Sequence, residues 1–219
     1  MVRPDPIPNS AVKHSLADGS ACIACARVGC RQILSLKAGL KVRLFYFTIR
    51  RRKACSAGVK ILFIGDVVGE PGRRAIQTLV PSMRRDLGLD WVVANGENIA
   101  GGSGITIKTG SALFDSGVDV ITSGDHVWDQ KESIGWIVQE PRLLRPINYP
   151  AEAPGRGSIV LEKDGFNRLA VINVQGRVFM QALENPFSVM EKEVERLRAI
   201  TPNILVDIHA EATSEKIAM

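Results

Sequence analysis

Residues 59–66 read Val-Lys-Ile-Leu-Phe-Ile-Gly-Asp and decide the fold class of this chain. Val59 to Ile64 is a short apolar run rich in β-branched residues, which is typical of a strand buried on both faces. Gly65 lets the backbone turn sharply, and Asp66 then leaves a carboxylate at the carboxyl end of the strand. A strand of this kind, followed by a turn and a helix, predicts an α/β protein.

The same unit of strand, turn and helix recurs after it. The turn at 69–72 contains two glycines and a proline, and residues 74–87 place apolar side chains three and four apart, which predicts a helix that stops at Gly88. A hairpin is predicted around Asp164-Gly165. We therefore expect one mixed sheet that is parallel at first and gains antiparallel strands later. Strands are expected at 59–64, 91–94, 118–123, 158–163, 169–174 and 203–207, and helices at 74–87, 106–114, 128–138 and 186–200.

Polar side chains follow these strands at the points where they end. The stretches are Gly65-Asp66, Asn95-Gly96-Glu97-Asn98, Gly124-Asp125-His126 and Asp207-Ile208-His209. Ligands bind open α/β sheets at this edge. Each stretch alone has a simpler interpretation as a turn, a helix cap or a structural histidine. Together they supply carboxylate, amide and imidazole groups at one edge, which favours a shared binuclear metal site.

Two other classes of protein stay open at this point. Gly65, Gly69 and Gly72 resemble a dinucleotide-binding loop, but their spacing differs from that of the nucleotide motif, so an oxidoreductase has weak support. A non-catalytic α/β protein that binds nucleotide or metal is the stronger alternative.

The charge of the chain is divided unevenly. The 219 residues carry a net charge of +5, yet residues 1–58 hold 11 Lys and Arg against 2 acidic residues, and the remainder holds 17 against 21. The basic character therefore belongs to the first segment, and the overall charge is no argument for nucleic-acid binding. We expect residues 1–58 to be a poorly ordered basic extension and residues 59–219 to be one domain.

The first segment also holds all four cysteines, which are Cys22, Cys25, Cys30 and Cys55. Their spacing suggests a zinc or redox site, but a second well-spaced pair is missing. A body without cysteine favours a reducing, cytoplasmic location. The basic cluster at 50–53 follows an apolar run, which is the reverse of a secretory signal, and an organelle transit peptide lacks its amphipathic helix. No apolar run is long enough to span a membrane.

The strand-end motifs resemble those of the YmdB-like metallophosphoesterases, a branch of the calcineurin-like phosphoesterase superfamily. The matching stretches are 65–69, 95–98, 124–129 and 207–216, the last reading Asp-Ile-His-Ala-Glu-Ala-Thr-Ser-Glu-Lys. The resemblance covers residues 59–219. It implies an α/β fold in which a sandwich of two sheets is flanked by helices and encloses two divalent metal ions, without distinguishing Fe, Mn, Zn and Mg.

The resemblance also implies a role for each residue. The family hydrolyses phosphodiesters, including 2′,3′-cyclic nucleotides, so the expected partner is a small phosphodiester, with RNA and a second copy of the chain left open. By this carry-over Asp66 and Asn98 bind the first ion, Glu97 bridges both ions, Asp125 and His209 bind the second, and His126 protonates the leaving group.

The chain departs from the family pattern in two ways. The family commonly has Asn where this chain has Asp125, and an added negative charge there would alter metal preference. Family members also continue beyond the Ser-Glu-Lys motif to a His-x-His pair, whereas this chain stops at Met219. The expectation is therefore a member truncated at its C-terminus, lacking the final strand and helix, with weakened metal binding and impaired activity.

Overall fold

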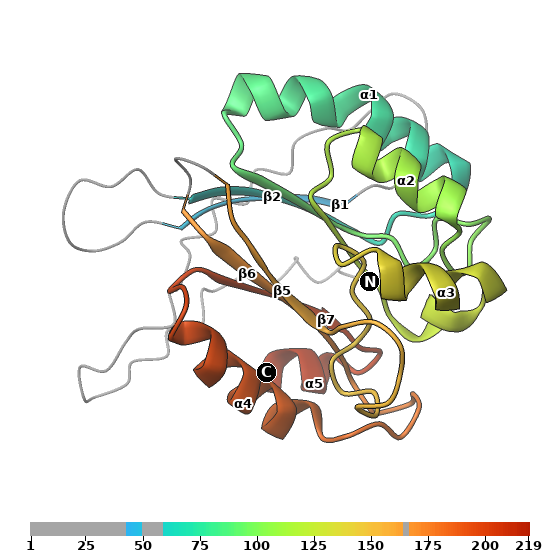
Figure 1. Cartoon of the computed structure of the whole chain (residues 1–219), viewed down its shortest axis with the longest axis vertical. Coiled ribbons are helices and arrows are strands. Elements are labelled where there is room, and N and C mark those ends of the chain that lie inside the picture. The colour runs from blue at the N-terminus through green and yellow to red at the C-terminus, as the bar shows by residue number, and fades with distance from the viewer. Residues whose placement is uncertain (1–42, 50–58, 164–166) are drawn as a thin grey trace, which may run out of the picture.

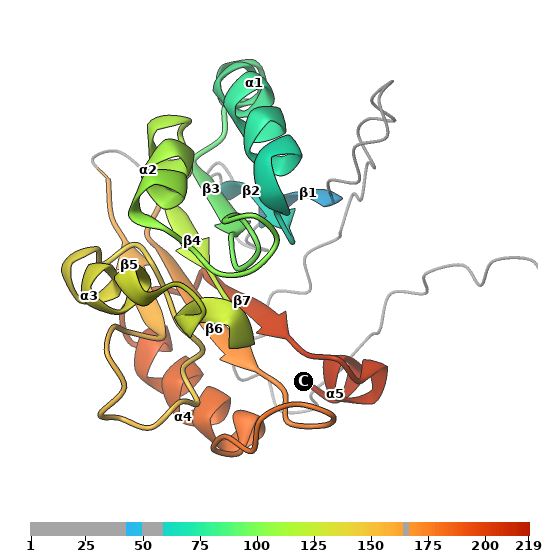
Figure 2. The same cartoon turned by 90° about the vertical axis from the view of Figure 1, so that its right-hand side faces the viewer.

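The computed structural model describes residues 43–49, 59–163 and 167–219, and in these two β-sheets face each other between two layers of helices (Figure 1). The view turned by 90° shows the same layers from the side (Figure 2). An α/β fold with two sheets flanked by helices is thus confirmed. The four cysteines lie outside the described residues, as does the Asp164-Gly165 turn.

The first sheet has four strands in the order β1-β2-β3-β4. The parallel strands β2, β3 and β4 carry the apolar runs that the sequence predicts, and β1 pairs antiparallel with β2. Strand β1 lies within the segment 1–58 that the sequence analysis expects to be a poorly ordered extension, and that expectation stays a prediction. The domain boundary at residue 58 stays a prediction. The strands span Arg43–Ile49, Val59–Gly65, Trp91–Asn95 and Val120–Thr122.

Helices α1 (Gly69–Leu87) and α2 (Ile107–Asp115) cover the outer face of this sheet. Apolar residues of both helices, such as Val80 and Leu113, pack with Leu62, Val92 and Ile121 of the strands. The helix ends follow ordinary capping rules. Gly88 ends α1 in the left-handed conformation with φ 59°, and its amide donates to the carbonyl groups of Arg84 and Arg85. The predicted helix at 128–138 is confirmed as α3 (Lys131–Gln139), which begins three residues later than predicted and is preceded by a 3₁₀ turn, η1 (Asp125–Trp128).

The second sheet contains β5 (Ser158–Leu161), β6 (Leu169–Gln175) and β7 (Ile204–His209). Strands β5 and β6 form the predicted antiparallel pair, and β7 lies parallel to β6. Helices α4 (Pro186–Arg198) and α5 (Thr213–Ala218) lie on the side of this sheet away from the first (Figure 1).

The prediction of one continuous mixed sheet is wrong, because the strands form two separate sheets. Between β4 and β5 the chain makes only isolated bridges, Ile121 with Leu143 and Leu144 with Arg156. Prolines at 141, 146 and 150 lack the amide hydrogen that a continuous ladder needs. The connecting segment therefore leads to a second sheet rather than extending the first.

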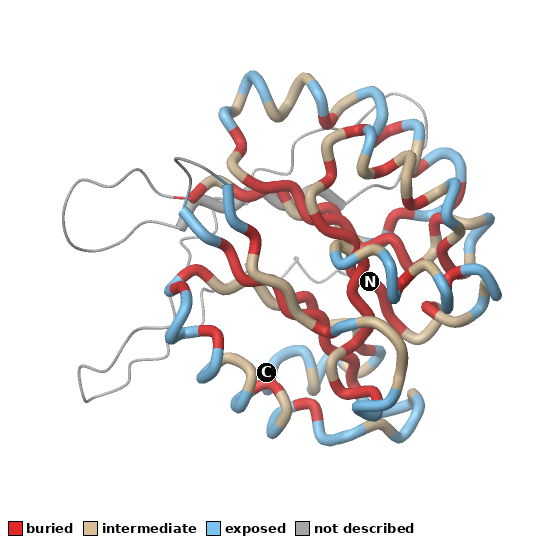
Figure 3. Tube along the Cα trace, viewed as in Figure 1, coloured by how far each residue is buried: buried red, intermediate tan, exposed pale blue. Residues whose placement is uncertain are grey.

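The space between the sheets changes character along the strands. Toward the strand starts it is filled by apolar side chains, including Ile61, Val93 and Val171. Toward the strand ends it holds a polar layer, whose members are buried. Strands β3, β4 and β6 are buried along their whole length (Figure 3). The polar layer consists of Asn95, Thr122, Ser123, Asn173 and Asp207.

Hydrogen bonds within the polar layer join one sheet to the other. The carboxylate of Asp207 on β7 accepts from Asn95 Nδ2 at 3.0 Å and from Thr122 Oγ1 at 2.5 Å. Asn173 Nδ2 donates to the carbonyl oxygen of Ser123 at 3.0 Å. Burial raises the pKa of Asp207, although the hydrogen bonds from Thr122 and Asn95 oppose that shift.

In the described part of the chain, no helix has both the length and the apolar character needed to cross a bilayer.

Candidate metal centre

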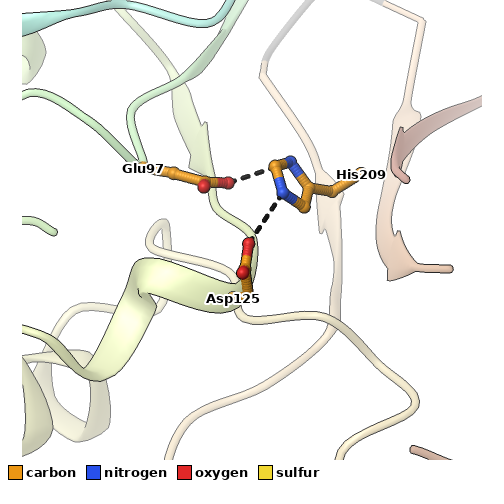
Figure 4. A group of neighbouring side chains, drawn as sticks. All are labelled: Glu97, Asp125 and His209. Carbon is orange, nitrogen blue, oxygen red and sulfur yellow. Dashed lines mark hydrogen bonds and ion pairs between the residues drawn. The ribbon is translucent and has the colours of Figure 1, made fainter. Parts of the chain in front are cut away.

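Three of the expected ligand residues come together where strands of both sheets end. Glu97 follows β3, Asp125 begins η1 after β4, and His209 is the last residue of β7. The imidazole of His209 lies between the two carboxylates (Figure 4), with Nδ1 2.9 Å from Glu97 Oε2 and Nε2 2.9 Å from Asp125 Oδ1. One ligand atom from each residue lies within 4.8 Å of the others. This is a group of side chains that could hold a metal ion.

The charged groups of this three-residue cluster lie at the edge of the protein interior. Glu97 is only 2% exposed. A neutral imidazole has a single N–H, so a ring that faces a carboxylate from each nitrogen favours the doubly protonated form. Burial lowers the pKa of His209, but the neighbouring Glu97 and Asp125 carboxylates outweigh burial and raise it. A positive charge is therefore stabilised between these two carboxylates.

Glu97 also has a buried acceptor. Its Oε2 atom is buried and, among the described residues, is paired only with His209 Nδ1, 2.9 Å away. A neutral His209 whose proton sits on Nε2 would leave this buried oxygen without a donor, which is costly. A bound cation would satisfy this oxygen, so the donor set fits a metal ion.

Gly124 leaves the room in which this cluster forms. A β-carbon there would meet Glu97 Oε2 and would lie 2.5 and 2.6 Å from His209 Cδ2 and Cγ. Its φ of −151° is extended backbone that any residue adopts, so the requirement for glycine is one of space alone. The glycine before Asp125 thus belongs to the site as much as the ligands do.

Asp66 and Asn98 form a neighbouring pair. Asn98 Nδ2 donates to Asp66 Oδ1 at 2.9 Å, and the Gly69 amide donates to the Asn98 carbonyl at 2.9 Å. Asp66 is exposed and has φ 46°, a left-handed conformation that costs energy for a residue with a side chain. The pair adjoins Glu97 through the chain, but the three-residue cluster in the described residues does not include it.

His126 points its ring at Asp129, which the sequence analysis did not single out. His126 Nδ1 lies 2.7 Å from Asp129 Oδ2, and Ser103 Oγ also hydrogen-bonds to that carboxylate. Burial lowers the pKa of His126, but the hydrogen bond with Asp129 and the nearby charges of Asp125 and Glu97 raise it overall. The sequence feature that could have identified Asp129 is its position three residues after His126, since three residues make one turn of a 3₁₀ helix.

Comparisons with known proteins give matches over most of this chain. A family model described as YmdB-like protein matches residues 62–219. The 2′,3′-cyclic-nucleotide 2′-phosphodiesterase of Bacillus subtilis is 44% identical over 161 residues, which are 74% of this chain and 61% of that relative.

Two crystal structures also superpose on the chain. A hypothetical protein from Thermus thermophilus has a TM-score of 0.65 and 40% identity, over 72% of this chain and 60% of its own. A phosphatase from Mycoplasma pneumoniae has a TM-score of 0.65 and 32% identity, over 73% and 58%. This chain thus spans about three fifths of the length of the proteins it matches.

Proposed function

This chain belongs to the YmdB-like protein family, and from that premise we propose that it is a metal-dependent phosphodiester hydrolase acting on 2′,3′-cyclic nucleotides or related phosphodiesters. The Bacillus subtilis relative is named for that reaction. The chain spans only part of the length of its relatives, so we propose that it shares their activity.

One observation carries the proposal. Ligand atoms of Glu97, Asp125 and His209 lie within 4.8 Å of one another, and the buried Glu97 Oε2 is paired, among the described residues, only with the ring of His209. Carboxylates and an imidazole together suit the divalent ions that phosphoesterases use.

The observed cluster supports three of the metal-binding roles, and the roles of Asp66 and Asn98 rest on the family resemblance. Asp66, Glu97, Asn98, Asp125 and His209 would hold two ions, with Glu97 serving both. Bound divalent ions supply charge neutralisation for the phosphoryl oxygens and lower the pKa of a water nucleophile. The buried position of Glu97 strengthens its attraction for cations, since the surrounding dielectric is low.

His126 is assigned as the general acid. Its Nδ1 is engaged by Asp129, and its Nε2 makes no hydrogen bond with a described residue. In the reaction, water attacks phosphorus, the bond from phosphorus to one ribose oxygen breaks, and His126 delivers a proton to that oxygen. A cyclic diester thereby opens to a monoester and a free hydroxyl group. Asp129 fixes the ring orientation for this transfer.

Hydrolysis of bis-p-nitrophenyl phosphate and of 2′,3′-cyclic AMP, with Mn²⁺ and after chelation by EDTA, tests the proposal. An oligoribonucleotide with a 2′,3′-cyclic phosphate end extends the same test to RNA. The critical variant is Glu97→Gln, which preserves shape and removes the charge. Asp86→Asn makes the same chemical change at an exposed position of α1.

We expect metal-dependent turnover that Glu97→Gln reduces by at least about 10²-fold and Asp86→Asn leaves intact. Turnover that survives EDTA, or a Glu97→Gln protein as active as the wild type, would refute the proposal. Metal binding without turnover would favour the non-catalytic alternative.

A further inference from the structure

The segment that follows β6 begins at the candidate metal centre. We call residues 176–184 the Phe179 loop. The amide of Gly176 donates to the carbonyl oxygen of His209 at 2.8 Å, so the loop leaves its strand beside the histidine of the cluster. The side view shows the chain leaving β6 at the same end of the sheet where β7 runs on into α5 (Figure 2).

A carboxylate from the segment after β7 clamps the start of this loop. Glu215 of α5 accepts hydrogen bonds from the amides of Arg177, at 2.9 and 3.0 Å, and Val178, at 3.0 Å. A β-carbon at Gly176 would meet the Glu215 carboxylate and lie 2.7 Å from Ala210 Cβ. The Ser-Glu-Lys motif thus has a physical task in this chain, which is to hold the Phe179 loop against the end of β7.

The far part of the loop is held by Asn148 and Tyr149, which precede β5. Asn148 Nδ2 donates to the carbonyl oxygens of Gln175, at 2.8 Å, and Glu184, at 3.2 Å. Tyr149 Oη donates to Gln181 Oε1 at 3.3 Å, and the Tyr149 ring packs edge-on against Trp128 with centroids 5.7 Å apart. Trp128 ends the same 3₁₀ turn that Asp125 begins. The loop is therefore anchored at its start by Glu215 and in its far part by Asn148 and Tyr149.

Phe179 stands out on this anchored loop. Its side chain is 90% exposed, more than any other large apolar side chain in the described ranges, and its φ is 66°. A positive φ is a genuine outlier for a bulky residue and is kept where surrounding contacts enforce it. Exposing an aromatic ring at that conformational cost contributes nothing to the core. A ring so presented is available to a ligand.

We propose that Phe179 is a stacking platform for the base of a nucleotide substrate. The inference rests on the proposed function, and it assigns to Phe179 the recognition of the base in a cyclic-nucleotide substrate. Three residues of chain reach at most about 10 Å, so Phe179 remains close to the strand end that carries His209. Every base has a π-face, so one exposed ring can accept different nucleotides.

The test compares two cyclic phosphodiesters that differ in the base, 2′,3′-cyclic AMP and methyl ribofuranoside 2,3-cyclic phosphate, which keeps the ribose ring and lacks the base. Phe179→Ala removes the ring, and Phe179→Trp keeps an aromatic face. Ile200→Ala removes an exposed apolar side chain near the opposite end of β7. Far-UV circular dichroism and thermal unfolding establish that each variant is folded.

Phe179→Ala should lower kcat/KM for 2′,3′-cyclic AMP about tenfold, since base stacking on an aromatic residue contributes that much. It should leave the base-free substrate within about twofold of the wild type, with Phe179→Trp and Ile200→Ala active on both. Equal losses on both substrates, or no loss on cyclic AMP, would overturn the inference.

A binding measurement separates this inference from the proposed function. If the wild type turns over neither substrate, the proposed function fails, and the affinity for adenosine 2′-monophosphate, measured by saturation-transfer NMR, decides the role of Phe179. An affinity about tenfold weaker in Phe179→Ala supports the stacking platform. An unchanged affinity, or no binding by the wild type, overturns it.

Discussion

Replacing Gly124 with alanine should disable the candidate metal centre through one added carbon atom. The φ of −151° is allowed for alanine, so the backbone conformation itself adds no strain. The added atom would lie 2.5 Å from His209 Cδ2 and would meet the carboxylate of Glu97. Both neighbours belong to the cluster, so the substitution displaces ligands directly.

The size of the effect follows from that overlap. Carbon atoms prefer separations of about 3.5 to 4.0 Å, so the His209 ring or the backbone must move by about 1 Å. A displacement of about 1 Å at a catalytic group lowers activity by about 10²-fold. Overpacking of a buried site also costs about 1 to 3 kcal/mol of stability. For a domain of this size that lowers Tm by about 2 to 12 °C.

The assay combines Mn²⁺ affinity from isothermal titration calorimetry, thermal unfolding by circular dichroism and hydrolysis of bis-p-nitrophenyl phosphate. Gly135→Ala is the matched control, since a β-carbon there meets no atom within 4 Å and the residue lies in α3. That control should gain about 0.5 to 1 kcal/mol, because alanine favours the helix over glycine. Wild-type Mn²⁺ affinity in Gly124→Ala, together with an unchanged Tm, would show that this space is not needed.

Three further predictions concern other residues. Asp207→Ala should lower the free energy of unfolding in urea by about 2 to 5 kcal/mol, because two buried donors lose their acceptor; a loss below that of a surface substitution would contradict this. His126→Ala should reduce kcat by about 10² to 10⁴ with Mn²⁺ affinity retained, and Asp129→Asn should reduce it less, as orienting residues do; equal losses of metal affinity and turnover would argue against an acid role. Burial raises the pKa of Glu193, but the hydrogen bond from Arg196 helps to hold it below its ordinary value near 4.5. The stability that Glu193 contributes is thus complete above that value and is lost as pH falls below it. In Glu193→Gln the free energy of unfolding in urea should therefore fall less steeply with pH between about pH 5 and 3. A pH dependence as steep as that of the wild type would refute this.

Much of the local structure was accessible from sequence because the signals are local. The apolar run at 59–64 predicted β2, and Gly88 predicted the end of α1, since each depends on a few adjacent residues. The hairpin strands around residues 158–174 followed from composition in the same way. Polar residues after parallel strands predicted a common edge, and Glu97 and Asp125 do lie near each other there.

The features that sequence missed depend on contacts between distant segments. Asp207 looked like one more strand-end group, yet it is buried and bonded to the first sheet, 112 residues from Asn95. The order of elements could not decide between one sheet and two, because both arrangements bury the same apolar runs. The role of Glu215 also depends on a loop 38 residues away. Such contacts have no local periodicity by which to predict them.

The polar layer bears on how this chain avoids misfolding. Apolar surfaces attract without direction, so two purely apolar sheets could slide past each other at little penalty. Asp207, Asn95 and Thr122 remove that freedom, because any slip would leave charged and amide groups dehydrated and unmatched. Compact forms in which the two sheets are misaligned therefore have a higher free energy, and folding favours a single alignment of the sheets.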